Sequence, residues 1–255
     1  MLKLYNKEHV AIDTLTDTKD LKIEYVLSGE DLLEFSLSIS DEKINLLEEE
    51  GYIRTKDNEY VIKAIDPNDN FKRFSCNINV EALVGKAIAS FDTSNNNVND
   101  TIRLAIAGTG WILADNNITK RRTVRLTNTN ALEVLREVRK VFRVDIRYDA
   151  INKIIYVYEQ FGEDRGVYFS DELNLKSFSI PSDTYDYVTR LYPKGKDGLT
   201  IASINNGKEY IENFQYSNKV LELIWEDNRY TDVNSLKEDA EIKLDELSKP
   251  KRTYQ

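Results

Sequence analysis

The chain has 255 residues, of which 41% are hydrophobic, enough to build apolar cores and to exclude a wholly disordered protein. This length exceeds that of one small domain, so we expect two packed units. The 35 basic and 44 acidic residues give a formal net charge of -9. An acidic surface disfavours sequence-independent binding to nucleic acid phosphates or to anionic lipid.

Histidine and cysteine are almost absent. The chain holds one histidine, His9, and one cysteine, Cys76, so no intramolecular disulfide can form. A structural zinc site needs four such ligands, and a Cys–His dyad would have to use these two residues. We expect a buried Cys76 and a solvent-facing His9, with no catalytic, cofactor-binding or metal-binding residue and no cofactor.

Targeting signals are not visible in the sequence. The first residues lack the apolar segment of a signal peptide, and no run approaches the roughly 20 apolar residues that cross a bilayer. We expect a soluble protein that folds in a cytoplasm and has no membrane segment.

Residues 1–92 predict a β-rich domain, because short alternating segments are separated by turn sequences. This spacing favours a barrel or small sandwich. A short helix over 44–49 would end at Gly51 in the left-handed conformation. The expected strands are 22–26, 33–39, 52–55, 60–65 and 71–79.

Residues 93–175 predict an inserted α+β domain after a polar linker at 92–99. One helix would begin after Asn99 or Asp100 and end at Gly108. A second, over 131–142 and capped by Asn130, carries an apolar stripe. Strands over 144–148 and 154–158 would follow.

From residue 175 the β pattern returns, and we expect residues 176–231 to complete the barrel of the first domain. The tight-turn sequence at 205–207 predicts a hairpin between the last two strands. Residues 232–255 predict a helix, with a capping box from Ser235 to Glu238, and the start of a further region. The expected strands are 175–180, 187–192, 199–204 and 210–216.

Three loops resemble ligand-binding motifs, but each departs from the motif. In the loop 194–198, Asp197 stands where a phosphate loop needs Ser or Thr. The pair Gly108 and Gly110 lacks the third glycine of a dinucleotide fingerprint and ends a helix. The segment 66–70 offers oxygen ligands for calcium, but Phe71 replaces the glycine such a loop needs. We expect a surface loop, a chain turn and a β-turn.

The densest basic cluster is Lys120, Arg121, Arg122 and Arg125. It is either a phosphate-facing patch or a face that is solvated or meets an acidic surface of a neighbouring subunit. No aromatic residue lies within the cluster for base stacking, which favours the second interpretation.

Other candidate residues stand out less. Among 44 acidic residues, nothing marks a pair such as Glu159 and Asp164 as a glycosidase pair. Trp111 and Trp225 lie in apolar neighbourhoods, which favours core anchors over a carbohydrate platform.

Several segments together resemble a known family. They are Gly51-Tyr52-Ile53, residues 59–63, residues 108–111, residues 146–149, and above all residues 188–201 followed by 206–207 and 210–213. In order and spacing, over nearly the whole chain, they resemble the N-terminal hub portion of siphophage tail-tip proteins. This family is called prophage tail endopeptidase or tail-associated lysin.

The resemblance implies a predominantly β, α+β fold: a split, tail-tube-like barrel with an inserted α+β domain and a C-terminal helix. Like baseplate hubs of contractile tails, three copies would form a ring at the distal end of the tail tube. The implied partners are two further copies, the distal tail protein, other tail-tip subunits, and the tail tube or tape-measure protein. DNA would be transient cargo and not a specific ligand.

The function that follows is a non-catalytic structural protein of the virion tail tip, assembled in the cytoplasm of the bacterial host. Family members usually continue into a C-terminal region with lytic or receptor-binding activity, so we expect the chain to be part of a longer protein. Two alternatives stay open: a peptidoglycan endopeptidase, and a carbohydrate-binding module of the tip.

Overall fold

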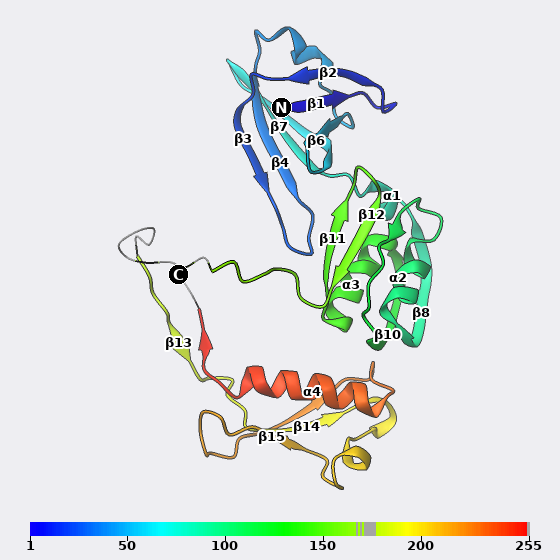
Figure 1. Cartoon of the computed structure of the whole chain (residues 1–255), viewed down its shortest axis with the longest axis vertical. Coiled ribbons are helices and arrows are strands. Elements are labelled where there is room, and N and C mark those ends of the chain that lie inside the picture. Colours follow the sequence, from blue (N-terminus) through cyan, green and yellow to red (C-terminus); the bar gives the residue numbers. More distant parts are fainter. Residues whose placement is uncertain (167, 169, 171–176, 254–255) are drawn as a thin grey trace. The chain divides into compact units, whose positions relative to one another are not determined.

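The computed structural model describes residues 1–166, 168, 170 and 177–253, and the chain forms two compact units (Figure 1). Unit 1 is made of Met1–Phe91, Val98–Lys120 and Arg125–Phe161. Unit 2 is made of Asp92–Asn97, Arg121–Val124 and Gly162–Gln255. The polypeptide therefore passes between the units more than once.

An antiparallel sheet of seven strands forms the N-terminal part of unit 1, and its strands pair in the order β2-β1-β5-β6-β7-β4-β3. Strand β4 shows why the sheet forms: Leu33, Phe35 and Leu37 alternate on one face and are buried. Phe35 lies opposite Phe74, with ring centroids 5.0 Å apart. The bounds are β1 (Leu2–Tyr5), β2 (Ala11–Leu15), β3 (Lys19–Glu24), β4 (Leu32–Ser38), β5 (Tyr52–Arg54), β6 (Glu59–Pro67) and β7 (Phe71–Ile78).

This sheet is open, although the predominantly β, α+β class is confirmed. Strands β2 and β3 stand at opposite ends of the strand order, and no sheet of the described residues closes into a barrel. Strands from 176–231 pair in sheets of their own and do not complete the first one. Their apolar positions are instead covered by the C-terminal helix, as Leu191 packs with Ala240 and Leu244.

Three local expectations for this region were wrong or incomplete. Strands β1 and β2 were not predicted, because each presents only a few alternating apolar residues. The segment after β4 is a 3-10 helix, η1 (Glu42–Leu46). The left-handed backbone after η1 is at Glu50, with φ 66°, and not at Gly51.

The rest of unit 1 is an α+β domain with helices beside a small sheet of order β11-β12-β9 (Figure 1). The prediction for its longer helix is confirmed, since the Asn130 side chain accepts a hydrogen bond from the Glu133 N–H at 2.9 Å. The apolar stripe of that helix, Leu135, Val138 and Phe142, is fully buried. The bounds are α1 (Glu81–Val84), α2 (Val98–Ile106), β9 (Ile112–Leu113), α3 (Ala131–Phe142), β11 (Asp145–Asp149) and β12 (Ile154–Tyr158).

The expected polar linker at 92–99 is wrong, because most of it belongs to strand β8 (Ala87–Asn97). Strand β8 pairs with β10 (Arg121–Asn130) in a two-stranded sheet. Most side chains of both strands are exposed or only partly buried. A ribbon that buries so little has no need of apolar alternation, so the sequence pattern that marks a strand is missing.

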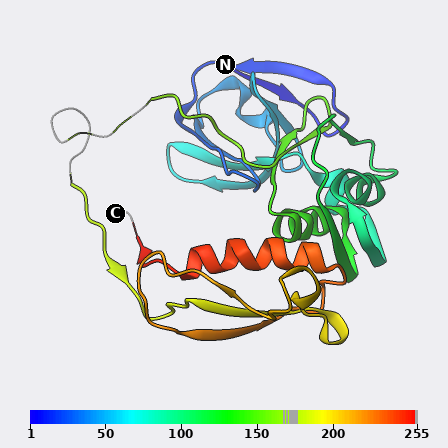
Figure 2. The ribbon, with the colours of Figure 1, turned by 60° about the horizontal axis from the view of Figure 1, so that its bottom comes forward.

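Unit 2 packs helix α4 (Val233–Leu247) along one face of a sheet of order β15-β14-β16 (Figure 2). The stripe Leu236, Ala240 and Leu244 is buried, as expected. The Asp232 side chain caps the helix by accepting from the Ser235 N–H at 2.8 Å, so Ser235 is not the cap. The bounds are β13 (Ser182–Asp183), β14 (Arg190–Lys194), β15 (Ile211–Glu212), β16 (Glu222–Glu226) and β17 (Lys251–Arg252).

The strands expected in this region were partly wrong. The segment 199–204 is not a strand: it contains the 3-10 turn η3 (Ala202–Ile204) and follows another, η2 (Lys196–Gly198). Strand β15 therefore pairs with β14, and the turn at Asn206 and Gly207, with φ 52° and 78°, follows η3. Part of the expected strand 175–180 lies outside the described residues, and residues 177–180 are not a strand.

Candidate assembly surfaces

The seven-stranded sheet of unit 1 has two edges with no further strand partner among the described strands. Strand β2 pairs only with β1, and β3 only with β4, among the described strands. Ile12 on β2 and Leu21 on β3 are exposed large apolar residues. An exposed edge strand with apolar side chains is a template for pairing with another chain.

The two edges differ in shape. In β3 the register shifts between Lys19 and Lys22, and Asp20 adopts a left-handed φ of 50°. Such a bulge bends the strand and limits which partner can pair with it. Strand β2 shows its own irregularity only toward its start, opposite Leu4 and Tyr5. A surface complementary to one edge is therefore not complementary to the other.

Unit 2 exposes a third edge, strand β16, which the sequence patterns did not predict. β16 pairs in parallel with β14 and has no further neighbour among the described strands. The segment that leads into it and the strand itself expose apolar side chains: Val220, Leu221, Leu223 and Ile224. This apolar run lacks the alternation with polar residues that marks a strand with one exposed face, so no strand was predicted here.

His9 is held by polar contacts on the seven-stranded sheet. Its Nε2 lies 3.0 Å from Glu59 Oε1, and its ring stacks on Tyr52 at 3.7 Å between centroids. Its side chain is 43% exposed, so the solvent-facing expectation holds only in part. Glu59 is buried and also accepts from Asn79 Nδ2 at 2.8 Å and from Arg54 Nε at 2.8 Å.

These contacts decide the charge of Glu59. Desolvation by burial alone would raise the pKa of its carboxyl, but the hydrogen bonds from His9, Asn79 and Arg54 outweigh it and lower the pKa. Because three donors converge on this carboxylate, the cluster joins strands β5 and β6 to the β1–β2 turn.

Cys76 is a buried core residue of strand β7, as expected. Burial raises the pKa of its thiol to about 12, so the thiol is neutral and unreactive near neutral pH. The single cysteine thus behaves as a small hydrophobic residue.

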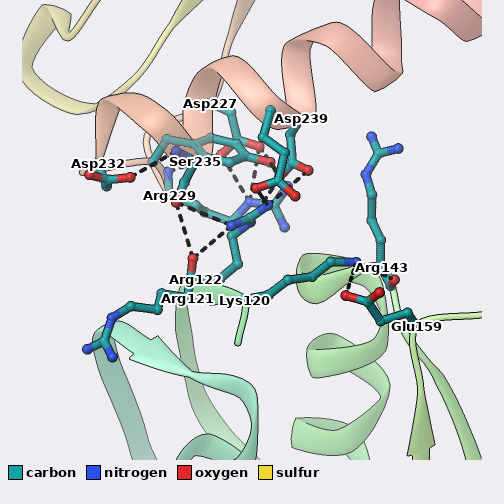
Figure 3. A network of polar contacts seen from close by, with 12 residues as sticks. Lys120, Arg121, Arg122, Arg143, Glu159, Asp227, Arg229, Asp232, Ser235 and Asp239 are labelled. Carbon is teal, nitrogen blue, oxygen red and sulfur yellow. Dashed lines mark hydrogen bonds and ion pairs between the residues drawn. The ribbon is translucent and has the colours of Figure 1, made fainter. Parts of the chain in front are cut away.

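The predicted basic cluster does not act as one surface. In unit 2 the Arg122 guanidinium is buried; it donates from Nε to Asp239 Oδ2 at 3.0 Å and from Nη2 to Glu238 Oε2 at 3.0 Å (Figure 3). Tyr230 Oη also donates to Asp239 Oδ2, at 2.6 Å. Arg121 next to it is exposed. The acidic partner that we expected on a neighbouring subunit is therefore provided, for Arg122, by helix α4 of the same chain.

This buried network is fully paired. Desolvation lowers the pKa of Arg122, but hydrogen bonds and charge from Asp239 and Glu238 outweigh it and raise the pKa. Arg122 also donates to Ser235 Oγ at 3.2 Å and to the Arg121 carbonyl at 2.8 Å. Because the buried guanidinium is hydrogen-bonded to acceptors on helix α4, it fixes the segment 121–124 to α4.

The three motif-like loops form ordinary turns. Lys194–Gly198 is tied down by Lys196 N–H donating to the Tyr230 carbonyl at 2.9 Å. Gly108 and Gly110 both have φ 79° and turn the chain after α2, as expected. In the turn after β6, Asn68 Oδ1 accepts from the Asn70 N–H at 3.0 Å, as in an Asx turn.

The remaining candidates each have local contacts within their own unit. Glu159 Oε1 lies 3.8 Å from Lys120 Nζ, and Asp164 Oδ1 accepts from the Gly166 N–H. Trp111 is buried against Tyr148 in unit 1, which confirms the core-anchor prediction. Trp225 is partly buried and packs on the cores of unit 2.

Two polar side chains join the sheet and the α+β domain inside unit 1. Ser28 Oγ accepts from the Ile146 N–H at 2.9 Å. Buried Asn58 donates from Nδ2 to the Tyr148 carbonyl at 3.0 Å and accepts from the Ala150 N–H at 2.8 Å. No sequence signal marks these contacts, because the partners are about 90 or more residues apart and all three partner groups belong to the backbone.

The fold is shared with solved phage tail proteins. Prophage tail protein gp18 from Listeria monocytogenes EGD-e superposes with a TM-score of 0.71 at 16% identity, covering 99% of this chain and 79% of that one. The tail protein from Neisseria meningitidis MC58 gives a TM-score of 0.60 at 9% identity, covering 95% and 75%. The 43 kDa tail protein of prophage MuSo2 from Shewanella oneidensis gives 0.56 at 10% identity, covering 95% and 76%. The fold is thus that of a phage tail protein.

Three models of one family match consecutive parts of the chain. The prophage endopeptidase tail N-terminal domain matches residues 2–82, the prophage endopeptidase tail domain matches residues 88–157, and the prophage endopeptidase tail model matches residues 163–255. The chain belongs to this prophage endopeptidase tail family, which confirms the resemblance seen in the sequence.

A curated relative covers a smaller part. SPbeta prophage-derived uncharacterized protein YomG from Bacillus subtilis (strain 168) is 31% identical over 100 residues. That match takes in 38% of this chain and spans 11% of the length of YomG. Separately, none of the helices in the described part of the chain has the length and apolar character that crossing a membrane requires.

Proposed function

We propose that this chain is a non-catalytic structural subunit of the phage tail tip. In this proposal three copies form a hub at the distal end of the tail tube, joining the tube to the host-facing tip. The observation that carries the proposal is the open seven-stranded sheet, whose edge strands β2 and β3 are both exposed and differ from each other.

Two different edges support a closed ring. When the β2 edge of one copy pairs with the β3 edge of the next, the contact is head-to-tail, and such contacts close into rings when the rotation allows. A C2 dimer would instead need one edge to pair with the same edge of a second copy. The distal tail protein, other tip subunits, and the tube or tape-measure protein would then contact the faces of the ring.

The charge of the chain suits a channel for DNA. With a formal net charge of -9, an acidic lining would repel phosphates and let DNA pass without binding. DNA is therefore proposed as cargo of the assembled tail.

Particle imaging tests the proposal. We expect electron micrographs of virions labelled with an antibody against this chain to show label at the tail tip, and a knockout to give tails without that density. Particles that carry the complete tip density without this protein would contradict it. Light scattering of the purified chain gives its mass, with a trimer expected.

A second candidate function is a peptidoglycan endopeptidase, favoured by the word endopeptidase in the description of the matching family. It requires catalytic groups within this chain. Release of cell-wall fragments by the purified chain, abolished by substitution of one acidic residue, would support it over the structural role. The proposed structural role predicts no release.

A further inference from the structure

A cavity of about 700 Å³ lies within unit 1, along the free edge of strand β11. This volume is typical of sites for small ligands or short peptide segments. The proposed hub function uses none of its lining. One wall is the loop before β4, a second is the β5–β6 turn, and the third is β11 with Phe161. The lining residues used below are Tyr25, Leu27, Lys56, Asp57, Arg147 and Phe161.

The edge of β11 leaves two backbone groups open to this cavity. The Ile146 N–H donates to Ser28 Oγ and the Tyr148 carbonyl accepts from Asn58, so both residues direct these groups away from β12. In an antiparallel pair, the N–H and C=O of one residue point to the same side. The Ile146 carbonyl and the Tyr148 N–H therefore also point outward, and contacts among the described residues give neither a partner.

The neighbouring strand agrees with this direction. The Ile155 carbonyl, opposite Tyr148, accepts from the Ala114 N–H at 2.9 Å and so points toward β9. Pairing with β12 thus leaves Ile146 and Tyr148 free on the cavity side.

An extended peptide residue fits the two open groups. In a parallel pair, a residue opposite Arg147 donates its N–H to the carbonyl of the preceding residue, Ile146, and accepts from the N–H of the following one, Tyr148. Ser28 and Asn58 occupy the edge on either side. The edge therefore admits one bridging residue. A saccharide ring does not present an N–H and a C=O in this arrangement.

The charged groups of the cavity favour an acidic side chain on the bridging peptide residue. Asp57 accepts from Tyr25 Oη at 3.1 Å, and the carboxylate of Asp31 accepts from the Val26 N–H at 2.9 Å. Arg147 lies over the Phe161 ring, 5.0 Å from its centroid. The Arg147 charge acts on the Asp31 carboxyl, but within the described residues neither Arg147 nor Lys56 is held in a direct ion pair, so both can contact an acidic ligand.

We propose that this cavity binds an extended peptide segment of a partner protein, parallel to β11, with an acidic residue opposite Arg147. Apolar residues on either side of the acidic one would pack on Tyr25 and Leu27, which are both exposed. The site is thus a further contact surface, separate from the edges β2 and β3 of the seven-stranded sheet.

Titration of the whole chain with a blocked tripeptide, acetyl-Val-Glu-Val-amide, tests this proposal by NMR. We expect the amide resonance of Tyr148 to shift at millimolar concentrations of peptide, because a single bridging residue gives weak binding. The variant Arg147→Ala is expected to bind about tenfold more weakly. Arg121→Ala removes an exposed guanidinium outside the cavity and is expected to bind like wild type.

Modified peptides separate backbone pairing from charge alone. N-methylation of the central Glu removes its N–H and is expected to abolish the Tyr148 shift, and a central Gln is expected to weaken it about tenfold. Binding that survives N-methylation, equal binding by Arg147→Ala, or an equal Tyr148 shift with N-acetylglucosamine would overturn the proposal. Absence of any shift with the parent peptide would overturn it as well.

Discussion

At the scale of single residues, the Arg122 network holds a buried pair of opposite charges, Arg122 and Asp239. The guanidinium is 5% exposed and its partner Asp239 is 1% exposed, so each would be an uncompensated buried charge without the other. Removing one partner of such a pair is far more costly than replacing both with apolar residues. The network therefore fixes the geometry of unit 2 more than it adds net stability.

The variant Arg122→Met should destabilise unit 2 by about 3–5 kcal/mol, because Asp239 is left buried and unpaired. The double variant Arg122→Met, Asp239→Leu should recover most of that loss. Urea unfolding followed by Trp225 fluorescence, in a Trp111→Phe background, measures both. Arg121→Ala is the matched control, expected within about 0.5 kcal/mol of wild type. A double variant no more stable than the single one would contradict the interpretation.

Glu59 gives the sheet a dependence on pH. Its folded-state pKa is lowered below the ordinary value of 4.5, so it stabilises unit 1 above about pH 4.5. This contribution is lost as the pH falls through the lower, folded-state pKa. The unfolding free energy of the wild type should therefore drop on acidification more steeply than that of Glu59→Gln.

The comparison is made by urea unfolding at a series of pH values, followed by Trp111 in a Trp225→Phe background. Near neutral pH, Glu59→Gln is expected to cost about 2 kcal/mol, because its donors lose a charged acceptor. That difference should shrink below about pH 4.5. The exposed Glu163→Gln is the control and should track the wild type. A constant difference across the series would refute the role of Glu59.

At the scale of elements, Asn58 joins two parts of unit 1 that different family models match. Its amide group mimics a neighbouring strand, because it pairs with a carbonyl and an N–H at the end of β11. Asn58→Ala should leave both groups buried and unpaired, at a cost of about 2–3 kcal/mol. The Ala150 amide should then exchange with solvent faster in hydrogen exchange. The exposed Asn218→Ala should change neither quantity.

Elements with a buried stripe were predictable from sequence, and exposed ones were not. Helix α3 has Asn130 as a cap and Leu135, Val138 and Phe142 at helical spacing, so pattern and structure agree. Strands β8 and β10 expose most of their side chains, and no alternation marks them. The same holds for the candidate surfaces. Edge exposure depends on strand order, and strand order is set by pairing between distant segments.

Individual side chains show the same limit. Sequence identified Arg122 as part of a basic cluster, but its burial depends on Asp239, which is 117 residues away. Cys76 was assigned correctly, because alternation along one strand suffices to place a residue on the buried face. Local pattern thus predicts burial within an element, whereas polar partners require the tertiary fold.

At the scale of the whole molecule, the proposed ring makes the two sheet edges complementary parts of one contact. Ile12→Pro on β2 and Leu21→Pro on β3 each remove a backbone donor from one edge strand. Either variant alone should fail to form the trimer, while it stays folded as judged by its unfolding transition. In sedimentation, wild type should be trimeric and each variant monomeric.

Mixing the two variants separates a head-to-tail ring from other assemblies. Each variant keeps one intact edge, so the intact β3 edge of the Ile12→Pro chain can pair with the intact β2 edge of the Leu21→Pro chain. A head-to-tail contact therefore predicts dimers in the mixture and no trimers, because the remaining two edges are both blocked. If each edge paired with itself, each variant alone would still form dimers through its intact edge. Trimers from either variant alone would show that the assembly does not use these edges, and the ring would have to be built through another surface.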